Sequence, residues 1–498
     1  MSGGRDSPYL IVCDLGSSGG RIYLGWLEAG RLQAEELHRF ANGPVRIGEA
    51  WCWDILRIHD EALVGLRRAG ARIGSAPALI GVDSYGVDYG YIDPSGALLS
   101  PVRHMRDPRT GGVYAAIHAV LPKAELYRRA GAMTIEINTL AQLFAERRAQ
   151  PWLQDNAATL LFTPDLINYF LTGERASDLT IASTSQCVDP VTRAWAPDIL
   201  ERLSLPTHFL PPLVEPGREL APLRVALQRE TGLVPMTRIA SVAGHDTAAA
   251  VAATPFEPGR KAAFISLGTW SLLGREIEKP DLSDASLAAN YTNECGVGGR
   301  IAYHKILGGL WLLQECRRVW AGDDPKLDFA TLDADAAEAT PWAFLFDLDD
   351  PRFLSPENMP AAIAADFASR GRAAPLDRGA VVRAIYDSLA LNFRHAIEEM
   401  PGRPVFDAIH IVGGGAQSPL LCQAAADAIG APVVAGPVEA TVAGNMLCQL
   451  IAVGAIASLE EGREIVRRSF GQRTFQPRAG DGLERAYAEF VALKKAEG

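Results

Sequence analysis

A glycine-rich turn between two short apolar runs occurs twice in this chain. Residues 9–13 (YLIVC) are apolar, residues 14–20 (DLGSSGG) are rich in glycine and serine, and residues 21–27 resume a strand-like pattern. This arrangement predicts a β-hairpin. It returns at 261–277, where the shared Leu-Gly pair recurs after 252 residues, about half of the 498. The offset favours two domains of similar plan, although two shared residues do not by themselves distinguish duplication from coincidence.

Strands and helices alternate along both halves of the chain, which is typical of α/β layers. Thr254, Pro255, Pro258 and Gly259 cluster just before the second hairpin and predict a domain boundary there. We therefore predict an α/β protein with domains at 1–250 and 251–498. Strands are expected at 78–82, 87–93 and 408–412, helices at 139–149, 163–172, 248–253, 310–320, 378–400 and 418–429, and long loops or small inserted elements at 204–222 and 323–375.

The composition argues against two classes of partner. Lys and Arg number 48 against 59 Asp and Glu, and a net charge of −11 argues against a broad basic face for nucleic acid. The most apolar stretch, 239–253, is short and contains His245 and Asp246, so no membrane span is predicted. The seven cysteines form no CxxC pair and the N-terminus shows no secretory signal, so we expect a cytoplasmic protein.

The glycines of the two hairpin turns do not belong to the common nucleotide motifs. The chain has no GxxxxGK[ST], and no GxGxxG after a strand, so neither a P-loop nor a dinucleotide-binding turn is predicted. The segment from Asp14 to Arg21 still offers backbone N–H groups, two hydroxyls, a carboxylate and a guanidinium, which suit phosphate oxygens and a metal ion. Residues 266–271 (SLGTWS) offer a similar set. The alternative for each turn is a flexible loop without a ligand.

Another candidate site is the segment 244–247 (GHDT), which follows the apolar run 239–243. Ligands of open α/β sheets bind where the strands end. In such a place Asp246 can serve as the general base for a hydroxyl group. Asp246 can equally be the N-cap of the helix expected to follow, because Asp is a favoured capping residue.

Two further turns combine glycine with groups suited to a sugar or a nucleotide. Residues 83–89 (DSYGVDY) hold two carboxylates, a glycine and two tyrosines, a mixture that suits a polyol. Tyr85 and Tyr89 can instead be packing aromatics. The three glycines at 413–415 allow a flat ligand such as adenine to approach the backbone, or form a turn with no ligand.

These motifs occur together with others, in order, over nearly the whole chain. The set comprises DLGSSGGR from Asp14, DSYGVDY from Asp83, RDPRT from Arg106, NTLAQL from Asn138, GHDTAAA from Gly244, SLGTWSLLG from Ser266, AANYTNECG from Ala288, GLWLLQ from Gly309, DSLAL from Asp387, HIVGGGAQ from His410 and AGPVEAT from Ala435. With these motifs the chain resembles the FGGY carbohydrate kinases, and most closely the bacterial rhamnulokinases.

The resemblance implies two actin-like (ribonuclease-H-like) ATPase domains with the active site in an interdomain cleft. It implies phosphorylation of a ketose at its primary C1 hydroxyl with ATP and Mg²⁺. Asp246 is then the catalytic base, and sugar contacts fall on Gly86, His245, Asp246 and Thr247. Nucleotide contacts fall on Ser17, Ser18, Gly19, Gly20, Arg21, Thr269, Gln314 and Gly414, and Asp14 matches a carboxylate near the metal.

Three positions depart from the rhamnulokinase pattern. Tyr85 stands in place of Trp, Gly244 in place of Ser, and Ile306 in place of a sugar-binding Asn. Loss of an amide removes directional contacts that distinguish sugar epimers, so kinases of L-fuculose, L-ribulose or L-xylulose are alternatives to a kinase of L-rhamnulose. An actin-like ATPase switch without sugar turnover, or a family member that only binds sugar, are different alternatives. The sequence leaves open the roles of Arg106 and Gln142, and the choice between monomer and homodimer.

Overall fold

The computed structural model describes residues 7–322, 324–354 and 356–497. These residues form two compact units. Unit 1 contains the residues up to Pro255 together with Glu276–Tyr303 and Ala440–Ser469, and unit 2 contains Phe256–Arg275, His304–Glu439 and the residues from Phe470 onwards. Unit 1 thus includes two segments from the second half of the sequence. Residues 1–6, in which no secretory signal is expected, and positions 323 and 355 of one predicted loop region lie outside the described residues.

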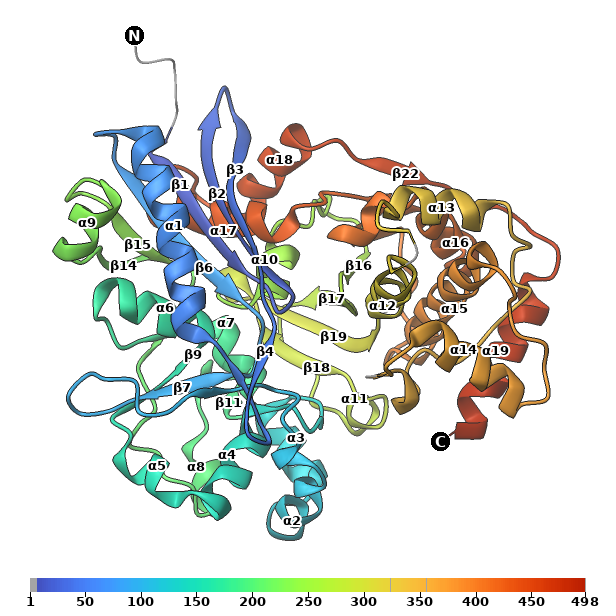
Figure 1. The fold of residues 1–498 in the computed structure, drawn as a ribbon, viewed down its shortest axis with the longest axis horizontal. Helices are drawn as coiled ribbons and strands as arrows, with labels where there is room; N and C mark the ends of the chain where they lie inside the picture. Colours follow the sequence, from blue (N-terminus) through green and yellow to red (C-terminus); the bar gives the residue numbers. More distant parts are fainter. Residues whose placement is uncertain (1–6, 323, 355, 498) are drawn as a thin grey trace. The chain divides into compact units, whose positions relative to one another are not determined.

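Unit 1 contains a six-stranded sheet in the order β14-β15-β6-β1-β2-β3 (Figure 1). Strand β1 is antiparallel to β2 and parallel to β6, and β6 is parallel to β15. Every β1 residue after Tyr9 is buried, as expected for a strand in the middle of a sheet that begins with an apolar run at residues 9–13. The first predicted hairpin is therefore confirmed. The strands are β1 (Tyr9–Leu15), β2 (Gly19–Glu28), β3 (Arg31–Ala41), β6 (Ala78–Ser84), β14 (Arg218–Pro222) and β15 (Arg238–Ser241).

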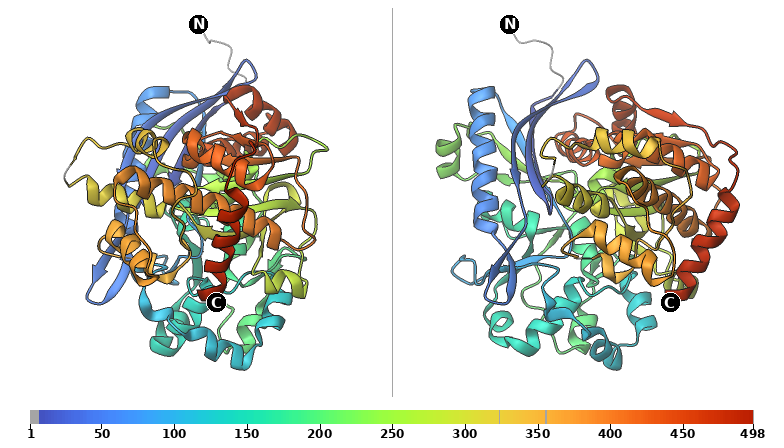
Figure 2. Two further views of the ribbon diagram at one scale, coloured as in Figure 1. Left: turned by 90° about the vertical axis from the view of Figure 1, so that its right-hand side faces the viewer. Right: turned by 45° about the vertical axis from the view of Figure 1, so that its right-hand side comes forward.

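Helices cover both faces of this sheet. On β2, Ile22 meets Gly65 of α1 (Ile55–Ile73), whereas Gly25 meets Met446 of α17 (Ala440–Ala452). Residues three apart on a strand point to opposite faces, so α1 and α17 lie on opposite sides. Helix α1 packs against β1, β2 and β3, and the right-hand view in Figure 2 shows it running beside these strands. Helix α17 also packs against α10 (Asp246–Ala252), where a Cβ at Gly444 would lie 1.8 Å from a backbone oxygen of α10, so glycine is required.

The remainder of unit 1 consists of short strands and helices. Its other strands are β4 (Pro44–Ile47), β5 (Ala50–Trp53), β7 (Tyr89–Ile92), β8 (Val102–Arg103), β9 (Thr159–Phe162), β10 (Ser177–Asp178), β11 (Val188–Asp189), β12 (Ala194–Trp195), β13 (Leu213–Val214) and β18 (Thr292–Cys295). Its other helices are α2 (Val113–Val120), α3 (Lys123–Ala130), α4 (Thr139–Ala149), α5 (Pro151–Asn156), α6 (Thr163–Thr172), α7 (Leu179–Ala182), α8 (Pro197–Arg202), α9 (Val225–Thr231), α11 (Asp284–Ala288) and α18 (Leu459–Ser469).

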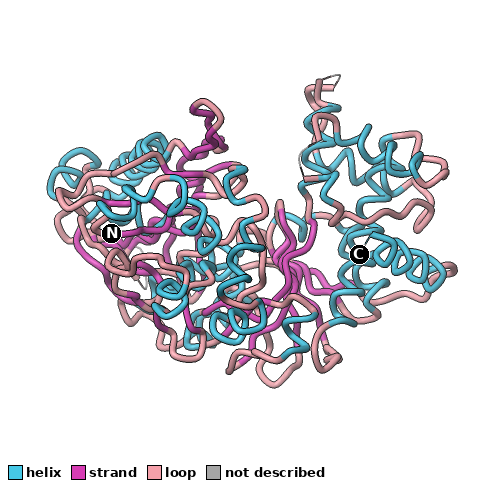
Figure 3. The backbone as a smooth tube through the Cα atoms, turned by 90° about the horizontal axis from the view of Figure 1, so that it is seen from below, coloured by secondary structure: helices cyan, strands magenta, loops and turns pink. Residues whose placement is uncertain are grey.

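Unit 2 contains most of a second sheet, in the order β18-β19-β17-β16-β20-β21-β22, of which β18, the last residues of β17 and the first residues of β19 are counted with unit 1. Strand β16 is antiparallel to β17 and parallel to β20, which repeats the pairing of β1 with β2 and β6 and confirms the second hairpin. Figure 3 shows helices beside the strands of this unit. The elements are β16 (Ala262–Leu267), β17 (Trp270–Ile277), β19 (Ile301–Gly308), α12 (Trp311–Trp320), α13 (Phe329–Ala337), α14 (Met359–Ser369), α15 (Arg378–Glu399), β20 (Ala408–Val412), α16 (Pro419–Ile429), β21 (Val433–Ala435), β22 (Arg473–Phe475) and α19 (Leu483–Glu497).

Most of the predicted elements are present, with one informative shift. Helices α4 and α6 and strand β20 have the predicted bounds, and the loop expected at 323–375 contains the small helices α13 and α14. The strand expected to begin at Val87 begins at Tyr89 instead. Val87 has a φ of +69°, a left-handed conformation that is strained for a β-branched residue and cannot continue a strand.

Candidate active site

The carboxyl ends of three parallel strands in unit 1 bring together acidic residues from distant parts of the sequence. Asp14 near the end of β1 pairs in register with Asp83 of β6. The next residue, Ser84, donates its backbone N–H to the oxygen of Gly244 at 2.8 Å and forms a β-bridge with His245. Burial is the main reason why the pKa values of Asp14 and Asp83 are raised, and the negative charge of Asp246 adds to the shift of both.

Different partners face Asp14 and Asp83. Burial raises the pKa of Asp14, but Arg21 opposes this shift through a contact of 2.5 Å between Nη2 and Oδ2. Burial and the charge of Asp14 raise the pKa of Asp83 well above its ordinary value, and the Asn445 amide donates to Asp83 Oδ2 at 2.6 Å. The guanidinium therefore favours an ionised Asp14, whereas Asp83 more readily keeps a proton.

Asp246 is the first residue of α10, and the N-cap position belongs to His245. One carboxylate oxygen, Oδ1, accepts the backbone N–H of Thr247 at 2.6 Å. The side chain remains 35% exposed. Desolvation raises the pKa of Asp246, while the neighbouring His245 charge lowers it. The prediction of Asp246 as the N-cap is therefore wrong, because its carboxylate contacts only the following residue, Thr247, through the backbone N–H and the hydroxyl group. The exposed part of the carboxylate is available to a hydroxyl group.

The loop before Asp246 is held by two buried side chains of the β10–α7 segment. Asp178 Oδ1 accepts the backbone N–H of Gly244 at 2.9 Å, and Thr180 Oγ1 accepts that of His245 at 3.3 Å. Burial raises the pKa of Asp178 to about 6, against the lowering effect of the hydrogen bonds that Asp178 accepts from Thr180 and Gly244. A Cβ at Gly244 would lie 3.3 Å from the Asp178 side chain, so a larger residue here would need a small adjustment of its surroundings.

The turn that contains Gly86 is also fixed by side chains. Val87 donates its N–H to Thr184 Oγ1 at 3.1 Å, and its carbonyl accepts the Thr139 hydroxyl at 2.7 Å. Tyr85 is buried and stacks on Trp53 with ring centroids 4.2 Å apart. Tyr85 therefore has a packing role in this unit.

The sequence left open the roles of Gln142 and Arg106. Gln142 is buried, and its Nε2 donates to Asp88 Oδ1 at 2.9 Å while its Oε1 accepts from Arg109. Its amide thus supports the turn rather than facing outward. Arg106 donates its backbone N–H to His104 Nδ1 at 2.9 Å, which belongs to the same supporting network.

The first predicted phosphate turn joins β1 to β2. Asn42 ties it from both sides, since its Nδ2 donates to the Gly16 oxygen at 2.9 Å and its N–H donates to the Ser18 oxygen at 3.1 Å. Ser18 is exposed, Ser17 and Gly19 are half-buried, and Gly20 is buried. A Cβ at Gly20 would lie 2.2 Å from the Phe40 ring. Gly20 is therefore required by packing, and Ser18 is the most open member of the turn.

The nucleotide contacts predicted in the second half of the chain lie in unit 2. Thr269 and Gln314 lie side by side, with Thr269 Oγ1 donating to Gln314 Oε1 at 3.3 Å. The segment that precedes Gln314 can approach the Thr269 turn closely because residue 309 is glycine, where a Cβ would lie 2.5 Å from the backbone of Trp270. Gly414 is exposed at the start of a 3₁₀ turn that follows β20.

Three buried residues of unit 1 that support the site had no role assigned from the sequence. Glu294 lies 3.1 Å from His245, Asn445 binds Asp83, and Arg463 binds the last carbonyls of α10. Glu294 lies within the family motif AANYTNECG that starts at Ala288, and this motif is a signal by which it could have been found. Asn445 and Arg463 follow Asp83 and Asp246 by hundreds of residues, and no local pattern connects them.

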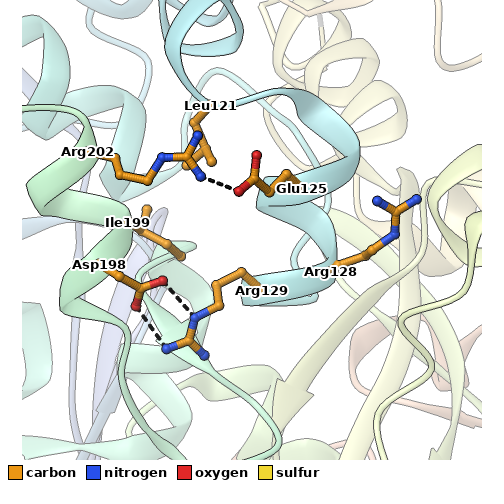
Figure 4. A pocket seen from close by; sticks show the side chains of 7 residues that line it. All are labelled: Leu121, Glu125, Arg128, Arg129, Asp198, Ile199 and Arg202. Atoms are coloured by element: carbon orange, nitrogen blue, oxygen red, sulfur yellow. Dashed lines mark hydrogen bonds and ion pairs between the residues drawn. The ribbon is translucent and has the colours of Figure 1, made fainter.

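A surface pocket between α3 and α8 is separate from these residues (Figure 4). Arg129 pairs with Asp198 at 2.8 Å, and Arg202 pairs with Glu125. Arg128 pairs with Asp284 at 2.8 Å. Because each guanidinium of the pocket already has a carboxylate partner, the pocket offers no surplus positive charge for a phosphate.

Two family models match the chain. The N-terminal domain of the FGGY family of carbohydrate kinases matches residues 9–252, and the C-terminal domain matches residues 263–453. The rhamnulokinase of Bacteroides thetaiotaomicron is 37% identical over 483 residues, which cover 96% of this chain and 98% of the relative. The rhamnulokinase of Bacillus subtilis is 36% identical over 93% of this chain and 94% of the relative.

Solved structures of sugar and polyol kinases share the fold. The ligand-bound xylulose kinase of Lactobacillus acidophilus has a TM-score of 0.77 at 15% identity and covers 98% of this chain and 96% of its own. The glycerol kinase of Plasmodium falciparum with ADP has a TM-score of 0.75 at 13% identity and covers 98% of both chains. The predicted α/β class with two actin-like ATPase domains is therefore confirmed. The chain belongs to the FGGY family of carbohydrate kinases and is an enzyme that phosphorylates a sugar with ATP.

Proposed function

We propose that the protein transfers the γ-phosphoryl group of ATP to the primary C1 hydroxyl of a ketose, with L-rhamnulose as its first candidate substrate. Support for the sugar comes from the two rhamnulokinases at 36–37% identity over more than nine-tenths of the chain. The observation that carries the reaction type is the exposed carboxylate of Asp246 at the end of the β1, β6 and β15 strands. A partly exposed carboxylate beside a cationic ring can accept the proton of a hydroxyl group.

The proposed roles divide by unit. In unit 1, Gly86, His245 and Thr247 contact the sugar, Asp246 takes the hydroxyl proton, and the turn from Ser17 to Arg21 contacts phosphate oxygens. In unit 2, Thr269, Gln314 and Gly414 contact the nucleotide. Phosphoryl transfer depends mainly on positioning and on charge stabilisation, which suits groups held by networks of hydrogen bonds.

A magnesium ion fits this proposal only as a partner of the nucleotide. Within the described residues, no group of three His, Cys, Asp or Glu side chains is placed to hold a metal ion. Mg²⁺ commonly keeps several waters and is bound through one or two carboxylates and the substrate phosphates. Asp14 is the residue that would hold it here, and the bound ion would neutralise phosphate charge.

Of the three departures from the rhamnulokinase pattern, two lie in closely packed surroundings within unit 1. Tyr85 stacks on Trp53, and Gly244 packs against Asp178. Ile306 keeps a half-buried side chain on β19. We therefore propose Ile306 as the position that decides between L-rhamnulose and L-fuculose, L-ribulose or L-xylulose.

A panel of ketoses and polyols tests the proposal, with purified protein, ATP and Mg²⁺, followed by position analysis of the product. We expect one ketose to be phosphorylated at C1, and Ile306→Asn to shift the preference toward L-rhamnulose. ATP consumption that does not depend on any ketose would instead favour the ATPase switch. If Ile306→Asn has the same substrate preference as the wild type, Ile306 does not determine which ketose is phosphorylated.

The proposed location is the cytoplasm. All seven cysteines are buried free thiols, as expected in a reducing compartment. Among the described residues, the helices are too short or too polar to span a bilayer. A monomer or a homodimer remains the expectation for the oligomeric state.

A further inference from the structure

His245 lies between two carboxylates that come from different elements of unit 1. Its Nδ1 is 3.1 Å from Glu294 Oε2 on β18, and its Nε2 is 3.5 Å from Asp246 Oδ1 on α10. His245 is 8% exposed and Glu294 is 6% exposed. The ring therefore lies within ion-pair distance of a buried acid on one side and of the proposed catalytic base on the other, although neither contact has hydrogen-bond geometry in this structure.

The groups that face this ring are acidic. Burial alone would lower the pKa of His245, but Glu294, Asp246 and Asp178 together raise it above its ordinary value, with Glu294 as the strongest of the three. An ionised carboxylate only accepts hydrogen bonds, so a ring between two carboxylates is matched at both ends only when both nitrogens carry a proton. The cationic ring also lowers the pKa of Asp246. A cationic His245 thus keeps its neighbour ionised and able to accept a proton.

We propose that Glu294 is a positioning residue of the enzyme, which holds the buried His245 ring in its doubly protonated form between Glu294 and Asp246. The inference rests on the proposed role of Asp246 as the base. Glu294 does not contact the reacting atoms. It acts through His245, which remains protonated beside Asp246 during proton transfer.

The direct test measures the titration of His245 in the full-length protein by NMR, with ¹³C-labelled histidine rings and His245→Gln to assign the signal. In the wild type the midpoint is expected above the ordinary histidine pKa of about 6.5. In Glu294→Gln the midpoint is expected below it, because burial then outweighs the remaining acids. An unchanged midpoint in Glu294→Gln would overturn the proposal.

The kinetic test uses the same variant with the ketose identified by the panel. We expect kcat/KM to fall about 10- to 100-fold, on the scale of one hydrogen bond to a charged group. The alkaline limb of the pH profile should move to lower pH, since a neutral His245 appears earlier. A loss of activity without movement of that limb would indicate a merely structural role and contradict the proposal.

Glu146→Gln is the matched control. Glu146 is also a buried glutamate of unit 1, but it accepts the Tyr91 hydroxyl at 2.7 Å and lies outside the site. The alkaline limb of the pH profile of Glu146→Gln should lie at the same pH as in the wild type. If the wild type phosphorylates no ketose, the proposed function fails, while the NMR titration still decides whether Glu294 sets the charge of His245.

Discussion

Arg463 of α18 should determine how firmly the helix of Asp246 is held. The side chain is 4% exposed, and it donates from Nε to the Ala252 oxygen at 3.1 Å and from Nη2 to the Val251 oxygen at 3.0 Å. These are the last carbonyls of α10, whose first residue is Asp246. Nη2 also lies 2.8 Å from Glu276 Oε1. Arg463→Met keeps most of the apolar stem but removes all three contacts.

The loss of stability in Arg463→Met arises mainly from the buried carboxylate of Glu276, which loses the Arg463 guanidinium as its partner. Removing one partner of a buried ion pair typically costs about 3–5 kcal/mol, because the other charge stays desolvated. Arg300 Nε remains 4.0 Å from Glu276 Oε2 and compensates in part, so we expect about 3 kcal/mol. At about 2 °C per kcal/mol for a unit of this size, the midpoint of thermal unfolding should fall by about 6 °C.

Thermal and urea unfolding measure the loss of stability in Arg463→Met. We also expect kcat to fall, because α10 is then no longer held at the end opposite Asp246. The double variant Arg463→Met with Glu276→Leu should recover much of the stability, since no unpaired charge remains. The exposed Arg468→Met is the control and should cost less than about 1 kcal/mol. If Arg463→Met is as stable as Arg468→Met, or if the double variant is no more stable than the single one, Arg463 does not stabilise α10 through a buried ion pair.

Two further predictions concern buried aspartates of unit 1. Asp178→Ala leaves the Gly244 N–H without its acceptor, so the free energy of unfolding should fall by about 1–3 kcal/mol, and kcat should also fall. The control variant Asp189→Ala should also be less stable, but its kcat should be unchanged. Burial raises the pKa of Asp88 to about 6, so folding favours its protonated form. The stability of the wild type relative to Asp88→Asn should therefore decrease by up to about 3 kcal/mol as pH rises from about 4 to about 6, and then level off. A flat difference in urea midpoints across that range would contradict this assignment.

Elements with local signals could be predicted closely from the sequence. Helix α6 starts with a proline in its first turn and ends at Gly173 with a φ of +91°, and its predicted bounds agree with the structure. Strand β20 is an apolar run that stops at three glycines. The two hairpins were recognisable because strand, turn and strand lie next to each other in the chain. Such features depend on neighbours within a few residues.

The supporting contacts of the site could not be predicted in this way. Asn445 and Asp83 meet because α17 packs on the sheet of the first strands, and nothing near either residue records that packing. The left-handed Val87 is held by Thr184 and Thr139, so its own β-branched side chain pointed to the wrong local structure. Glu294 reaches His245 from a strand about 50 residues away, a separation at which chain proximity carries little information. Tertiary packing overrides local preference at each of these positions.

The proposed reaction depends on Asp246 as the group that accepts the proton of the sugar hydroxyl. Asp246→Asn keeps the side-chain oxygen that accepts the Thr247 N–H, so the fold and the binding of ATP and ketose should persist by calorimetry. Single-turnover measurement of phosphoryl transfer at saturating substrates should show a loss of about 100- to 10,000-fold, the range typical of a positioned general base. A variant that retains turnover within a few-fold of the wild type would contradict the account.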